Sequence, residues 1–147
     1  AGQRSFDYAS NVSVRFSSRL ALAMAYVGLS DFEKSQQVLL ESLDFLHPVD
    51  NYRGVVYLSI PMLAAIRHHW GQSYIATEYL SMAFHHLPKS QSFIHKWQYI
   101  DELKQALRMT LSPTDFERAW TGGRSLDLTT TIQDFLNDAR HAQEMTE

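Results

Sequence analysis

Apolar and small residues recur along the chain with the period of an α-helix. Between positions 32 and 46 they fall three, seven, ten, eleven and fourteen places after the first, on one face of a single helix. Gly28 and the pair Ser30 and Asp31 supply a helix stop and a new N-cap just before this stripe. The pattern therefore predicts a helix that packs along one side, through Phe32, Ser35, Leu39, Ser42, Leu43 and Leu46.

The helix that stops near Gly28 and the helix over 32–46 form a first pair. A second pair of helices is predicted between positions 55 and 88. The segment Trp70–Gln72 reads as the turn between them, and Pro88 ends the second helix because proline cannot continue it. Pro61 lies inside the first helix of this pair. That helix therefore either begins near Ser59 or carries a kink.

Three further helices are predicted in the C-terminal third. An amphipathic stripe places the first at about 93–109, and the second begins at an N-cap, Ser112, and stops at the pair Gly122–Gly123. Asp127 then caps a last helix, whose polar tail from Asp138 onward is expected to fray. The buried face of the last helix is predicted to be Leu128, Ile132, Phe135, Leu136 and Ala139.

The two helix pairs are copies of one unit. A shift of 41 positions aligns small residues with small ones and large apolar residues with large ones, as internal repeats do. Pro48 and Pro88 close the two units one residue out of step. The chain is therefore predicted to be all-α and built from helical hairpins. The matched positions are Leu22 and Leu63, Ala23 and Ala64, Ser30 and Gly71, Ser35 and Ala76, Leu39 and Leu80, Ser42 and Ala83, Leu43 and Phe84, and Leu46 and Leu87.

The order of these residues resembles the tetratricopeptide repeat (TPR). Arg67 departs from the family, which has tyrosine there; Ser35 and Ser42 replace alanines, and the spacing of 41 exceeds the usual ~34. The resemblance implies a right-handed α-α superhelix of TPR-like hairpins, with repeat 1 over 12–48, repeat 2 over 55–88 and capping helices over 93–142. It rests on Leu22, Ala23, Tyr26, Asp31, Phe32, Ser35, Leu39, Ser42 and Pro48, and on Leu63, Ala64, Gly71, Ala76, Leu80, Ala83 and Pro88.

A further motif comprises Leu111, Phe116, Ala119, Trp120, Gly123, Arg124, Leu126, Leu128 and Ile132. It resembles the end of the TPR region in large bacterial STAND-type signalling ATPases, which include LuxR-type and winged-helix transcriptional regulators. Ser112 and Asp127 depart from the pattern of that family, which usually has glycine and serine at these two positions. The resemblance implies a non-catalytic, effector-sensing or protein-binding module of a cytoplasmic regulator. Because the chain starts at Ala1 rather than Met, we expect a piece of a longer protein, with 1–11 as the end of a preceding helix or a lead.

Composition excludes several classes of protein. The 147 residues are 45% hydrophobic and 20% charged, which suits one globular domain. The formal net charge is −3, and the charged residues are scattered along the chain. No basic face is therefore expected to bind nucleic acid. The absence of cysteine excludes disulfides and thiolate chemistry. No apolar run reaches the roughly 20 residues of a membrane span.

Neither a metal site nor a catalytic site is predicted. His68 and His69 end one helix of the second hairpin and His85 and His86 end the other, so at least ~15 Å separates the two pairs. No phosphate loop or nucleophile motif occurs, and the pair Gly122–Gly123 reads as a helix stop, with Arg124 expected to lie against Trp120. We therefore expect no cofactor and no enzyme activity in this chain.

The TPR resemblance implies a partner-binding groove along the first helix of each hairpin. A protein or peptide, or another domain of the parent chain, would bind there; the alternative is that neighbouring helices cover this face. A homodimer through an exposed repeat edge, a freestanding scaffold or adaptor, and a small-molecule or metal pocket around His68, Trp70, His85, His95 and Trp97 are further alternatives. The implied groove residues are Ser17, Leu20, Met24, Val27, Leu58, Pro61, Ala65 and His68.

Overall fold

Helices make up all of the regular structure that the computed structural model describes, which covers residues 15–16, 18–46, 56–86 and 97–146. No strand occurs in these ranges, so the predicted all-α class is confirmed. Ser17, Pro48, Pro88, His95 and the stretch 1–11 lie outside them. After a helix at 18–28 come α2 (Phe32–Leu46), α4 (Ile60–His69), α5 (Ser73–His86), α6 (Gln98–Thr110), α7 (Pro113–Gly123) and α8 (Leu128–Thr146).

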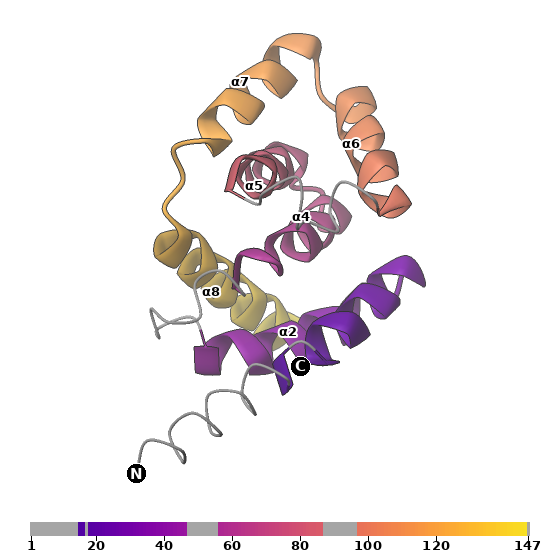
Figure 1. Ribbon diagram of the computed structural model, residues 1–147, viewed down its shortest axis with the longest axis vertical. Helices are drawn as coiled ribbons and strands as arrows, with labels where there is room; N and C mark the ends of the chain where they lie inside the picture. The colour runs from indigo at the N-terminus through magenta and orange to yellow at the C-terminus, as the bar shows by residue number, and fades with distance from the viewer. Residues whose placement is uncertain (1–14, 17, 47–55, 87–96, 147) are drawn as a thin grey trace.

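The hairpin of α4 and α5 lies in the middle of the molecule (Figure 1). Helices α6 and α7 pack over α5 on one side, and α8 leads from α7 back to α2 on the other. Met62, Leu63, Leu80 and Met82 of the central hairpin are fully buried in the one core that these helices share. The predicted buried face of α8 is confirmed, because all five of its residues lie in that core.

The turns of the two hairpins share the hydrogen bonds that close the first helix of each, at the predicted spacing of 41. The amides of Ser30 and Asp31 donate to carbonyls three and five residues back, and those of Gly71 and Gln72 do the same, at 2.8–3.0 Å. This is the Schellman pattern that closes a helix. Among the described residues, Ser30 and Gly71 are also the two with positive φ, at 61° and 81°. The helix stop of the first hairpin therefore lies at Ser30, whereas Gly28 is still helical.

The start of α4 decides between the two alternatives that Pro61 left open. The helix begins at Ile60 after Ser59, and Pro61 occupies its first turn, where a missing amide proton costs no hydrogen bond. No kink is needed. Helix α6 begins later than predicted, at Gln98, because the backbone of Trp97 is extended.

The predicted caps of the last two helices are confirmed. The Ser112 hydroxyl accepts a hydrogen bond from the Asp115 amide at 3.1 Å, and the Asp127 carboxylate accepts one from the Thr130 amide at 2.9 Å. Gly123, in contrast, does more than end α7. A Cβ there would overlap the Glu78 carbonyl oxygen and lie 2.7 Å from the Ser81 Cβ, so this glycine lets α7 lie directly on α5.

The C-terminal tail that was expected to fray is helical as far as Thr146. Helix α8 continues to Thr146 because its second half packs against α2. The Gln36 amide donates to the Ala139 carbonyl at 3.4 Å, and Arg140 pairs with Asp44. Helix α8, which follows α7 in the sequence, thus packs against the first hairpin.

Candidate functional site

Four of the eight implied groove residues are buried. Leu20, Val27, Pro61 and Ala65 are buried, so the alternative in which neighbouring helices cover this face describes them. Met24, Leu58 and His68 are half-buried, and Ser17 lies outside the described residues.

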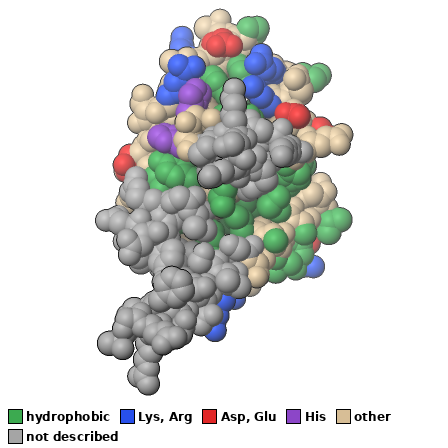
Figure 2. Space-filling view, in the orientation of Figure 1, with side chains coloured by type: hydrophobic (Ala, Val, Ile, Leu, Met, Phe, Trp, Pro, Cys, Tyr) green, Lys and Arg blue, Asp and Glu red, His purple; other side chains and the backbone are tan. Residues whose placement is uncertain are grey.

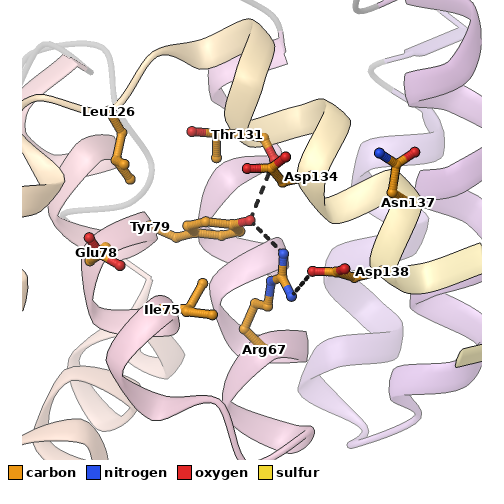
Figure 3. A pocket seen from close by; sticks show the side chains of 9 residues that line it. All are labelled: Arg67, Ile75, Glu78, Tyr79, Leu126, Thr131, Asp134, Asn137 and Asp138. Carbon is orange, nitrogen blue, oxygen red and sulfur yellow. Dashed lines mark hydrogen bonds and ion pairs between the residues drawn. The ribbon is translucent and has the colours of Figure 1, made fainter. Parts of the chain in front are cut away.

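Arg67 is the centre of the most unusual cluster in the molecule. Its side chain is only 2% exposed, and it lies on α4 at the position that the shift of 41 aligns with Tyr26. One terminal nitrogen donates to the Gln72 amide oxygen and to the Asp138 carboxylate, both at 2.7 Å, and the other donates to the Tyr79 hydroxyl at 2.9 Å. Because Tyr79 belongs to α5 and Asp138 to α8, one guanidinium fastens three helices together (Figure 3).

Aromatic rings take the place of water around this charge. The guanidinium carbon lies 5.3–5.7 Å from the ring centres of Trp70, Tyr79 and Phe135, within the range of cation–π attraction. Trp70 and Phe135 also stack on each other at 5.6 Å. The Nε of Arg67 is the one buried side-chain polar atom of the described residues that has no hydrogen-bond partner. The rings and the Asp138 carboxylate therefore stabilise a charge that burial alone would penalise.

A pocket of about 340 Å³ opens beside this cluster, between α5 and α8 (Figure 3). Burial raises the pKa of the Glu78 carboxyl at its edge. Burial also raises the pKa of the Tyr79 hydroxyl, and the neighbouring Arg67 partly opposes that rise. The Tyr79 hydroxyl donates to the Thr131 carbonyl at 3.4 Å, while the Asp138 carboxylate is held by Arg67. The polar groups at the bottom of the pocket therefore hydrogen-bond to each other. This arrangement suits a contact that holds the helices together better than a ligand-binding site.

The histidines lie in separate places. The His68 ring contacts the Ser73 hydroxyl at 3.0 Å, and burial, with the charge of His69, lowers the pKa of His68. His69 stacks on Phe32 at 4.4 Å, whereas His85 lies at the other end of the hairpin, against Trp120. His68 and His85 therefore lie at opposite ends of the hairpin, and His95, which the alternative pocket also includes, lies outside the described residues. In the part of the chain that the structure describes, no three His, Asp or Glu residues gather as metal ligands do.

The cation that lies on Trp120 is not the predicted one. Lys104 of α6 lies 4.5 Å from the ring centre of Trp120, and Arg108 lies 4.5 Å from that of Phe116, while Arg124 is exposed. Burial, with the nearby charge of Arg108, lowers the pKa of Lys104. Lys and Arg side chains also gather at the α6–α7 end of the face seen in Figure 2.

Sequence reasoning missed an apolar face on the helix at 18–28. We call it the open stripe; it comprises Ser18, Ala21, Leu22, Ala25 and Leu29. These residues are exposed, Leu22 by 45% and Leu29 by 77%. Their counterparts 41 positions later are Ser59, Met62, Leu63 and Ile66, all fully buried, and Trp70, which is half-buried. Comparison of the two repeats position by position was the signal that could have found it.

Comparisons of the chain with known protein families, with curated proteins and with solved structures find no match. None of the helices described above is long and apolar enough to cross a membrane. The case for a function therefore rests on the fold and on its surfaces.

Proposed function

We propose that this chain is a non-catalytic protein-interaction module built from two TPR-like hairpins, which stack as a right-handed superhelix and are closed by C-terminal capping helices. The observation that carries the proposal is the repeated hairpin turn, whose Schellman hydrogen bonds match at Ser30 and Gly71. Repeats of this size expose extended surfaces to partners. A cytoplasmic signalling ATPase or transcriptional regulator is the proposed parent, and a freestanding adaptor is the alternative.

Large exposed apolar side chains support an interaction role. Leu29, Tyr74 and Met109 are 77%, 36% and 87% exposed, and each lies at or beside a turn between helices. Tyr74 also lines an apolar hollow of about 370 Å³ together with Leu111 from the α6–α7 turn. Exposed apolar surface of this kind marks contact sites in soluble proteins.

The test is site-specific photo-crosslinking in the cells that produce the chain. A photoreactive phenylalanine analogue is placed at Leu29, Tyr74 or Met109, and at the exposed Gln133 of α8 as a matched control. We expect a discrete adduct from at least one of the three apolar positions and none from Gln133. The partner is then identified by mass spectrometry, and its binding to the purified chain is measured by calorimetry. The absence of an adduct at all three apolar positions contradicts the interaction role.

The parent protein is tested separately. Sequencing of the gene upstream of Ala1 distinguishes a regulator from an adaptor. A segment of the form Gly-x-x-x-x-Gly-Lys-Ser/Thr after an apolar strand supports the ATPase parent. An open reading frame that starts nearby without this segment supports the adaptor.

A further inference from the structure

The open stripe and its counterpart in α4 differ in what covers them. On α4, Trp70 is stacked under Phe135 of α8, and Leu63 and Ile66 are fully buried. On the helix at 18–28, the side chains at the equivalent positions are exposed, although they are small or apolar. This helix lies at the edge of the molecule beside α2 (Figure 1). One face of this helix lies in the core and the other is apolar and exposed. A second helix therefore has room to pack against the exposed face.

We propose that a second copy of this chain covers the open stripe, with the two helices antiparallel around a two-fold axis. The inference rests on the proposed function and names one partner for it. A two-fold contact uses the same surface on both copies, so the stripe must be complementary to itself.

The spacing of large and small residues meets that requirement. In an antiparallel pair, residues whose numbers have a constant sum face each other, and ridges of one helix enter the grooves of the other. With Leu22 opposite Ala25, Leu29 falls opposite Ser18. Each leucine of one copy then meets a small residue of its partner, and Ala25 and Ser18 each meet a leucine.

The same register brings opposite charges together at the ends of the contact. Arg15, which is exposed, falls beside the turn that leads into α2 of the other copy, where Glu33 is exposed. Among the described residues, neither of these two side chains has an ion-pair partner within its own copy. The contact would therefore place two Arg15–Glu33 pairs at its rim, where charges guide register more than they add affinity.

The capped end of the molecule limits the assembly to two copies. A head-to-tail stack would need the outer face of α5, but α7 already lies on it, with Gly123 against Glu78 and Ser81. Among contacts between copies, the open stripe then pairs with itself, and this contact closes after one partner. We expect a dimer without longer polymers.

A contact through one helix from each copy is small, so the dimer is expected to be weak. Interfaces below about 1,200 Å² belong to transient complexes, and a dissociation constant of about 10 μM to about 1 mM fits that class. Sedimentation velocity of the 147-residue chain over this concentration range is the direct measurement. We expect the monomer to shift to a dimer as the concentration rises.

Four variants test the register. Leu22→Glu should raise the dissociation constant at least about tenfold, because it buries a carboxylate opposite Ala25. Gln133→Glu, the matched control at the exposed α8 position that is also the crosslinking control, should leave association unchanged. Ala25→Leu should weaken the dimer because two leucines would meet. Arg15→Glu should weaken it too, and the double variant Arg15→Glu with Glu33→Arg should restore it. Far-UV circular dichroism checks that each variant is folded.

The outcomes separate this inference from the proposed function. A chain that stays monomeric at about 1 mM overturns the inference, as does a dimer that Leu22→Glu leaves intact. If the crosslinks then capture a different protein, the interaction role still stands. A dimer with the expected variant pattern supports the inference even where the crosslinking finds no other partner.

Discussion

The two hairpins share a turn but not an environment. Tyr26 and Arg67 occupy the same position of the repeat, four residues before the positive-φ residue that ends each helix. Tyr26 is half-buried with Lys34 5.8 Å from its ring centre, whereas Arg67 is enclosed by three aromatic rings and bound to α8. The local sequence thus sets the hairpin, and the helices that pack on it decide which side chains become core.

Replacement of Arg67 should have the largest effect. Arg67→Ala removes hydrogen bonds to α5 and α8 and leaves a cavity, so we expect the free energy of unfolding to fall by about 3–5 kcal/mol. The counterpart Tyr26→Ala should cost about 1–2 kcal/mol because Tyr26 is only half-buried. Urea denaturation followed by circular dichroism measures both.

Arg67→Met separates the charge from the volume of the side chain. Methionine fills much of the same space without the charge, and Asp138, which is 54% exposed, regains its water. We expect Arg67→Met to be more stable than Arg67→Ala. If both variants were as stable as the unsubstituted chain, the cluster would not hold the three helices together.

Leucine truncation compares the covered and the open stripe directly. Leu63 is fully buried and Leu22 is 45% exposed, at equivalent positions of the two repeats. Leu63→Ala should lower the free energy of unfolding by about 2–4 kcal/mol, and Leu22→Ala by less than about 1 kcal/mol. The measurement is made at low protein concentration, so that association through the open stripe does not contribute. Equal costs would mean that the stripe of the first hairpin is covered within one chain.

Replacement of Gly122 or Gly123 by alanine tests how closely α7 packs on α5 of the second hairpin. Gly123→Ala pushes a methyl group into the backbone of α5 and should cost about 1–3 kcal/mol. Gly122→Ala is the matched control, since its Cβ would lie 3.5 Å from the Glu78 carboxylate, an ordinary contact. Because alanine favours a helix, that variant should be neutral or stabilised by up to about 1 kcal/mol. Thermal melts of both variants decide whether α7 lies as close to α5 as described.

Much of the fold was predictable because its signals are local. The stripe from Phe32 to Leu46 predicted a helix where α2 lies, and Ser112 and Asp127 marked the starts of α7 and α8. A capping side chain bonds to amides two or three residues away, so one stretch of sequence contains the whole signal. The shift of 41 likewise aligned two turns whose hydrogen bonds proved to be the same.

What could not be predicted depends on contacts between distant segments. Arg67 resembles a surface residue in any helical pattern, and its partner Asp138 lies 71 positions away. Gly123 has the sequence signature of a helix stop, and only the position of α5 shows that a side chain has no room there. The burial of the implied groove residues depends in the same way on tertiary packing. Sequence periodicity shows which face of a helix is apolar, but not which helix will cover it.

The smallest effect should come from exchanging the two turn residues themselves. Ser30 has a φ of 61°, a conformation that costs a non-glycine residue about 1 kcal/mol, whereas Gly71 has a φ of 81°. Ser30→Gly should therefore raise the free energy of unfolding by up to about 1 kcal/mol, and Gly71→Ser should lower it by a similar amount. Nothing lies within 4 Å of a Cβ at Gly71, so strain in the backbone is the only cost expected there. Chemical denaturation of both variants checks the signs. Shifts in the same direction would show that the two turns are not equivalent, in spite of their matching hydrogen bonds.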